Sequence, residues 1–297
     1  MSNNQKIREE ITNQIITALE SGSLPPWRRP WSRDRNAGIP KNVVSGDLYS
    51  GVNPLLLGLA SDRHGFQSRH WGTFRQWQDL GGKVMRRPSH VPKGQWGTKI
   101  VFCKAVTKQK EDHDEPEETY FLLRTYTVFN IDQIEGDHLD YLRVGHGNDT
   151  RNSESVAYEE ADALIEATEA DIRHGGNQAF YDLAEDYIQV PNREQFSGSS
   201  YYETLFHELV HWTENQNRLN WDRNNNGYAL GELIAEIGAC YLCSELGIPT
   251  NDENHHAYLD GWLRNMKQDS SFIFKASSQA SKAADYIMSF KPVEVAG

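Results

Sequence analysis

The chain has few cysteines and no long apolar run. Only Cys103, Cys240 and Cys243 occur in 297 residues. An odd and small number excludes a disulfide framework as the basis of the fold and is typical of a reducing compartment. No stretch of about 18 apolar residues occurs, and the first residues lack the apolar segment of a secretion signal. We therefore expect no membrane span, no membrane partner and a cytoplasmic location.

Positive charge is scarce in the second part of the chain. Residues 1–110 hold 18 Lys and Arg against 7 Asp and Glu, whereas residues 111–297 hold 12 against 35. The net charges are +11 and −23, which sum to the −12 of the whole chain. This asymmetry indicates two modules with different partners, and the basic module suits a polyanion such as nucleic acid.

The periodicity of apolar residues predicts an α+β protein with two domains. Isoleucine and leucine at helical spacing predict a helix over residues 5–20, and β-branched and aromatic residues predict strands between 83 and 129. The polar stretch 136–155 is expected to be a linker between a domain at 1–135 and a domain at 156–297. The other predicted elements are helices at 54–62, 73–80, 156–172, 201–217 and 228–246, and a strand at 186–191.

Residues 205–212, LFHELVHW, place two histidines four positions apart. Because four residues make about one helical turn, His207 and His211 project from the same face of a helix. Two imidazoles in this arrangement can bind one divalent cation, and Glu208 between them is placed to act as the catalytic base. The alternative is a surface helix that carries two unrelated histidines.

A second helix offers the third protein ligand that a catalytic zinc requires. Residues 228–243, YALGELIAEIGACYLC, carry Glu232 and Glu236 one turn apart on an otherwise apolar helix. Burying two carboxylates there is costly unless a cation and a histidine partner them. We expect Glu232 to bind the metal and Glu236 to accept the N–H of a ligating histidine, although the spacing alone leaves open which acid is the ligand. Zinc suits this ligand set best, with manganese as the alternative.

The basic part interleaves arginine with tryptophan. Single-stranded nucleic acid is held by cationic grooves and by aromatic faces on which bases stack. Residues 27–33, WRRPWSR, and 69–77, RHWGTFRQW, have this composition, although buried tryptophans and solvated arginines would produce it too. The residues expected at DNA are Arg28, Arg29, Arg75, Arg86, Arg87, Lys93 and Lys99 for phosphates, and Trp31, Trp71 and Trp77 for bases.

Two features of the acidic part leave alternatives open. The strand at 186–191 could bind an extended peptide along a free edge, or it could be an ordinary strand inside a sheet. A peptidase also needs a donor for the oxyanion that forms during hydrolysis. The candidates are Tyr201, Tyr202, Tyr228, His255 and His256.

Several stretches of the chain resemble the ArdC antirestriction family. In the acidic part, FYDLAEDYIQVPNREQF, YYETLFHELVHWTENQNRL and ELIAEIGACYLCSELGI resemble the zincin-like domain of that family. The acids after the histidines also resemble those of thermolysin-like gluzincins, in which the first acid binds zinc and the acid four residues later orients a histidine. The chain departs from the family at Gly231, where an acid is expected, and at Glu214, where the family often has glycine.

The stretches PWRRPW, YSGVNPLLL, HWGTFRQWQDLGG and YTVFNIDQIEG resemble the N-terminal domain of the same family, which TraC-type plasmid primases share. The resemblance covers about residues 5–290. It implies a plasmid-encoded zinc metallopeptidase that binds single-stranded DNA and protects conjugatively transferred DNA from restriction in the bacterial cytoplasm. Its protein or peptide substrate would be a host restriction or DNA-associated protein. The alternative is a single-stranded-DNA shield whose zincin domain is structural or binds a partner.

Overall fold

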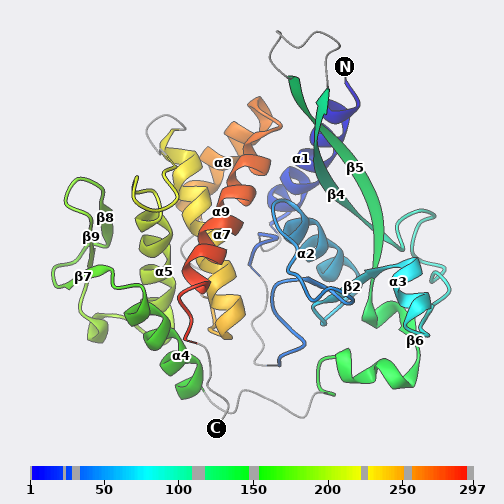
Figure 1. Ribbon diagram of the computed structural model, residues 1–297, viewed down its shortest axis with the longest axis horizontal. Helices are drawn as coiled ribbons and strands as arrows, with labels where there is room; N and C mark the ends of the chain where they lie inside the picture. The colour runs from blue at the N-terminus through cyan, green and yellow to red at the C-terminus, as the bar shows by residue number, and fades with distance from the viewer. Residues whose placement is uncertain are drawn as a thin grey trace.

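The structure is a computed structural model that describes residues 2–22, 25–28, 34–108, 118–146, 154–221, 227–250 and 256–292. A module of strands and short helices lies on one side of the molecule, and a bundle of longer helices lies on the other (Figure 1). This arrangement confirms the predicted α+β class. No helix in the described ranges is both long and apolar enough to cross a bilayer.

The strand module is built on a four-stranded sheet in the order β1-β2-β5-β4. Its two long strands, β4 and β5, form an antiparallel hairpin that extends beyond the neighbouring helices in Figure 1. A separate small sheet pairs β3 with β6. The elements are β1 (Lys41–Asn42), α2 (Asn53–His64), β2 (His70–Thr73), α3 (Phe74–Asp79), β3 (Lys83–Val84), β4 (Thr98–Lys108), β5 (Glu118–Asn130), η1 (Ile131–Gln133), β6 (Ile134–Glu135) and η2 (Asp137–Leu142).

Two small cores inside this module are built around tryptophans. Trp71 packs with Phe66 and neighbouring apolar residues, and Trp77 packs with residues that include Leu139 and Leu142. Both tryptophans have 0% of their surface exposed. The expectation that bases stack on Trp71 and Trp77 is therefore wrong for this conformation, because protein covers both ring faces. Leu139 and Leu142 also show that the stretch expected to be a linker begins with residues packed into this module.

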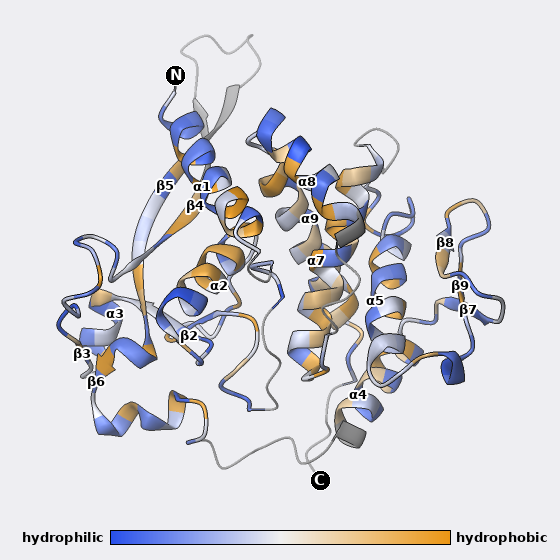
Figure 2. Ribbon diagram, turned by 180° about the vertical axis from the view of Figure 1, so that it is seen from behind, coloured by the Kyte–Doolittle hydropathy of each residue, from blue (hydrophilic) through white to orange (hydrophobic). Residues whose placement is uncertain are grey.

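The helical bundle centres on α7, which packs against both α5 and α9. Its ribbon is coloured largely hydrophobic in Figure 2, as expected for a helix that is surrounded by others. A three-stranded sheet in the order β7-β9-β8 lies beside α5. The elements are α4 (Glu154–Ala167), β7 (Asp171–His174), β8 (Phe180–Asp182), β9 (Tyr187–Val190), η3 (Arg193–Gln195), α5 (Ser200–Trp212), α7 (Tyr228–Leu246), α8 (His256–Gln268) and α9 (Phe272–Met288).

Two expectations for this half are decided by the structure. The strand expected at 186–191 forms as β9, the central strand of its sheet, so it is the ordinary strand inside a sheet and offers no free edge for a peptide. The helix expected at 156–172 ends at Ala167, and β7 follows. Glu169 between them adopts a left-handed backbone with φ of 53°, which interrupts an α-helix.

The helix α1 (Asn3–Glu20) and the residues after it connect the two halves. Ile11, Ile15 and Leu19 of α1 belong to the same core as the buried residues of the bundle. Beyond α1, the ring of Trp27 meets that of Trp262 on α8, with centroids 6.0 Å apart. The first part of the basic module is thus packed against the helices of the bundle.

Candidate metal centre

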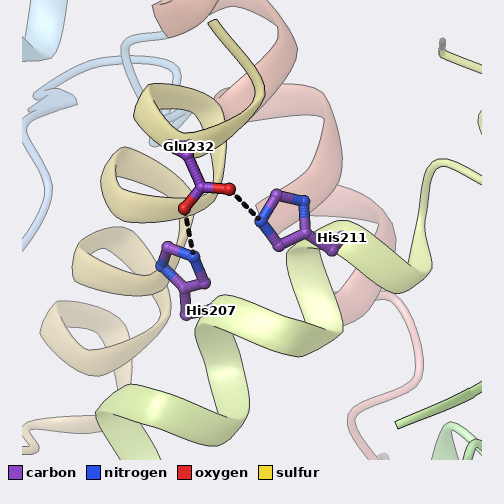
Figure 3. A group of neighbouring side chains, drawn as sticks. All are labelled: His207, His211 and Glu232. Atoms are coloured by element: carbon purple, nitrogen blue, oxygen red, sulfur yellow. Dashed lines mark ion pairs between the residues drawn. The ribbon is translucent and has the colours of Figure 1, made fainter. Parts of the chain in front are cut away.

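Two histidines of α5 and one glutamate of α7 converge on a common point (Figure 3). The Nε2 atom of His207 lies 3.4 Å from Glu232 Oε2, and the Nε2 atom of His211 lies 3.6 Å from Glu232 Oε1. The three donor atoms lie within 4.8 Å of one another. These are the three residues that the sequence predicts as metal ligands.

A glycine allows α7 to approach α5 closely enough for this convergence. A Cβ atom at Gly238 would lie 2.7 Å from a methyl group of Val210 on α5. Any side chain there would push the helices apart, because packed interiors do not absorb an added carbon without displacement. Gly238 lies almost two turns after Glu232, so the close approach holds the carboxylate near the histidines.

His211 is oriented by an acid that the sequence prediction overlooked. Its Nδ1 lies 2.5 Å from Glu214 Oε1, and both side chains are almost completely buried. With its proton on Nδ1 donated to Glu214, the ring presents the lone pair of Nε2 toward Glu232. Glu236 was expected to orient a ligating histidine. At His211 this role belongs to Glu214, which lies three residues after the histidine.

Glu236 instead forms an ion pair with an arginine from the other half of the molecule. Arg28 Nε donates to Glu236 Oε1 at 2.9 Å, and Arg28 Nη2 donates to Glu203 Oε1 at 2.5 Å. Only 2% of the Arg28 side chain is exposed. The expectation that Arg28 binds DNA phosphate is thus wrong for this conformation, because its guanidinium is buried between two carboxylates.

Two of the three ligands, His207 and Glu232, line a cavity of about 260 Å³. Glu208, predicted as the catalytic base, lies in the same wall as His207 and Glu232. Burial opposes the protonated form of His207, but the hydrogen bond to Glu232 and the charges of Glu208, Glu232 and Glu236 raise its pKa above the usual value. The cavity therefore favours positive charge, as a cation site requires. Other lining residues are Arg28, Glu203, Thr204, Glu236, Ala239, Tyr258 and Trp262.

The structure distinguishes among the candidate oxyanion donors. Tyr228 is 62% exposed at the start of α7, and partial burial together with its interactions with Tyr258 and Glu232 raises the pKa of its hydroxyl. Tyr201 contacts His174 through its hydroxyl, and Tyr202 donates to Asp162, so both are engaged elsewhere. Tyr258, which the sequence did not suggest, lines the cavity from α8. His255 and the side chain of His256 lie outside the described part.

The remaining residues expected at DNA lie on the surface of the strand module. Arg75 is 89% exposed, and among the described residues it forms a long ion pair of 3.8 Å with Asp79. The other exposed members of the set are Arg86, Arg87, Lys93 and Lys99. Arg29 and Trp31 lie outside the residues that the structure describes. Among the described residues, the phosphate-binding prediction thus keeps five accessible cations, without Trp71 and Trp77.

Comparison with known proteins assigns a family to each half. Residues 5–129 match the model of the N-terminal domain of the anti-restriction factor ArdC. Residues 159–279 match a zincin-like metallopeptidase model, so the domain that carries His207, His211 and Glu232 is of a metal-binding type.

Whole-chain relatives agree with these matches. The chain is 34% identical over 295 residues to the uncharacterized protein y4eC of Sinorhizobium fredii, covering 95% of this chain and 91% of that protein. It is 32% identical over 307 residues to the DNA primase TraC of Escherichia coli, covering 97% of this chain but only 27% of the primase.

Among solved structures, the antirestriction ArdC protein of plasmid R388 superposes on the chain. Its metal-free form gives a TM-score of 0.75 at 36% identity, covering 96% of this chain and 97% of that one. Its Mn(II)-bound form gives a TM-score of 0.73, also at 36% identity, covering 97% and 98%. These likenesses confirm the resemblance found in the sequence, and the chain belongs to the ArdC antirestriction family.

Proposed function

We propose that the protein is a metal-dependent peptidase that binds single-stranded DNA and protects conjugatively transferred DNA from restriction. The observation that carries the peptidase part is the convergence of two imidazole Nε2 atoms and one carboxylate beside Glu208. Membership of an antirestriction family and the likeness to TraC support the DNA part. The three cysteines and the transfer of DNA into a recipient favour action in the bacterial cytoplasm.

The donor set fits a divalent transition metal. His207, His211 and Glu232 would hold the ion, and the Nδ1 contact of His211 with Glu214 leaves its Nε2 available for coordination. Two histidines and a carboxylate with an open position are typical of catalytic zinc. The Mn(II)-bound relative supports manganese as an alternative. The bound ion would polarise the peptide carbonyl and lower the pKa of the attacking water.

The side chains around this position suit the proton transfers of hydrolysis. Glu208, nearly buried in the cavity wall, would take a proton from the attacking water and later deliver it to the leaving amine. Tyr228 and Tyr258 would donate hydrogen bonds to the carbonyl oxygen as negative charge develops on it. The substrate would be a protein met on DNA, brought to the cavity by the DNA-binding module.

Replacing Glu208 with Gln tests this function directly. The variant keeps the size of the side chain but loses the base, so protection of transferred DNA in a restricting recipient should disappear while single-stranded DNA binding persists. Glu185→Gln is the matched control, because Glu185 is 69% exposed and far in sequence from the ligands. Unchanged protection by Glu208→Gln would remove proteolysis from the mechanism.

The second candidate is a DNA shield without proteolysis. It is favoured by the size of the cavity, about 260 Å³, and by the Arg28 side chain in its wall. Ligand pockets usually exceed about 300 Å³. Under this candidate, Glu208→Gln and wild type would protect DNA equally well.

A further inference from the structure

A second cavity lies wholly within the N-terminal half of the chain. It measures about 400 Å³ and is bounded by α1, α2 and the loop that leads into β4. This volume is within the range of sites that take small molecules or single nucleotides. This cavity shares no lining residue with the metal cavity. Because Trp71 and Trp77 are buried, the position at which this module would hold a base is still to be found.

The floor of this cavity is apolar and its rim is cationic. Leu56, Leu59 and Ala60 of α2 form the floor. Arg63 and Lys99, both exposed, stand at the rim. Neither forms an ion pair with a carboxylate among the residues that the structure describes, whereas Arg75 and Lys83 do. Their charges are therefore available to an anion.

Polar and aromatic groups complete the lining. The amides of Gln14 and Gln95 can donate to and accept from the edge of any base. The ring of His64, also in the wall, lies edge-on to Trp96 with centroids 5.7 Å apart. Glu10 is the one acid of the lining, so the cations outnumber it.

We propose that this cavity, here called the α1–α2 pocket, holds one nucleotide of a bound DNA single strand. The base lies on Leu56, Leu59 and Ala60, and the flanking phosphates meet Arg63 and Lys99. Arg86, Arg87 and Lys93 are also exposed and precede Lys99 in the sequence, so they are candidates for further phosphate contacts along the DNA. The inference deepens the proposed DNA binding, and it is independent of proteolysis.

The test compares two charge-matched double variants of the full chain. A labelled dT oligonucleotide is titrated at several salt concentrations against Arg63→Gln/Lys99→Gln and against Lys6→Gln/Lys83→Gln, which lose the same charge elsewhere in the module. The pocket variant should bind roughly tenfold more weakly, and its salt slope should fall by about 1.4, since each single-strand phosphate contact contributes about 0.7. The control should bind as wild type does.

Two further measurements locate the bound DNA and show whether the pocket takes a DNA strand or a free nucleotide. An oligonucleotide that carries iodinated deoxyuridine should cross-link on irradiation to His64 in the pocket wall, as mapped by mass spectrometry. Thymidine monophosphate alone should show no saturable binding, because one nucleotide lacks the neighbouring phosphate contacts.

Three results would overturn the inference. They are equal losses in the two double variants, cross-links confined to residues outside the pocket, and saturable binding of the mononucleotide. Each of them leaves the proposed DNA binding intact as long as wild type binds the strand. Failure of wild type to bind any oligonucleotide at low salt would overturn both proposals together.

Discussion

The two halves of the molecule place a histidine in opposite electrostatic surroundings. In the strand module, burial and the positive charge of Lys41 lower the pKa of His70 to about 4. In the metal cavity, the neighbouring carboxylates raise the pKa of His207 despite burial. The positive charge near His70 and the negative charges near His207 thus follow the charge asymmetry of the sequence. The surroundings of His70 disfavour the positive charge of its ring, whereas those of His207 favour it.

Arg28 is the exception to this division, since it is a cation of the basic half that lies in the acidic cavity. Arg28→Met keeps much of its volume but leaves Glu203 and Glu236 buried without the guanidinium between them. Breaking such a buried pair should lower the free energy of unfolding by about 3–5 kcal/mol. Denaturant unfolding of the full chain measures this loss, with Arg75→Met as an exposed control that should change stability by less than about 0.5 kcal/mol.

A loss of oligonucleotide affinity in Arg28→Met without a loss of stability would contradict this account. It would return Arg28 to the DNA-binding set and restore the simple division between the halves.

His70 predicts a pH dependence of stability specific to the basic half. Its folded pKa of about 4 lies below the usual 6.5, so the unfolded chain takes up a proton first as pH falls. Stability is therefore fully present above about pH 6.5 and is lost as pH falls toward 4, by about 2 kcal/mol at pH 5. His70→Asn, whose amide can replace the Nδ1 donor to Leu142 O, should flatten this part of the curve. An unchanged slope in urea unfolding at several pH values would exclude His70 as the cause.

In the acidic half, Glu214→Gln tests the orientation of His211. The amide keeps the shape but no longer favours the Nδ1-protonated ring as strongly, so metal affinity should fall by about 10–100-fold. Competition with a chelating dye measures the affinity, and Glu185→Gln should bind the metal as wild type does. Equal affinities of Glu214→Gln and wild type would show that the helix alone orients the ring.

The metal ligands were predictable because the period of one helix fixes which side chains share a face. His207 and His211 need only the 3.6-residue repeat, whereas the cost of burying a carboxylate on an apolar helix indicated Glu232 and Glu236 alike and did not decide between them. Glu214 had a usable signal as well. It stands three residues after His211, within reach of the same face of the helix.

The DNA-binding residues were less predictable because exposure depends on contacts between distant parts of the chain. Nothing in the local sequence of Trp71 or Trp77 reveals that residues 131–142 and the β4–β5 hairpin cover their rings. The partners of Arg28 lie 175 and 208 residues away. Composition located the basic module, but the three-dimensional structure was needed to separate its accessible cations from its buried ones.

The most direct test of the metal centre is the affinity for Zn(II) and Mn(II) of Glu232→Gln and Glu236→Gln in the full chain. The account predicts that Glu232→Gln weakens binding by more than about a hundredfold, beyond the loss typical of residues that only support a ligand. Glu236→Gln, whose carboxylate pairs with Arg28, should stay within about tenfold of wild type. Strong binding by Glu232→Gln together with loss in Glu236→Gln would contradict it.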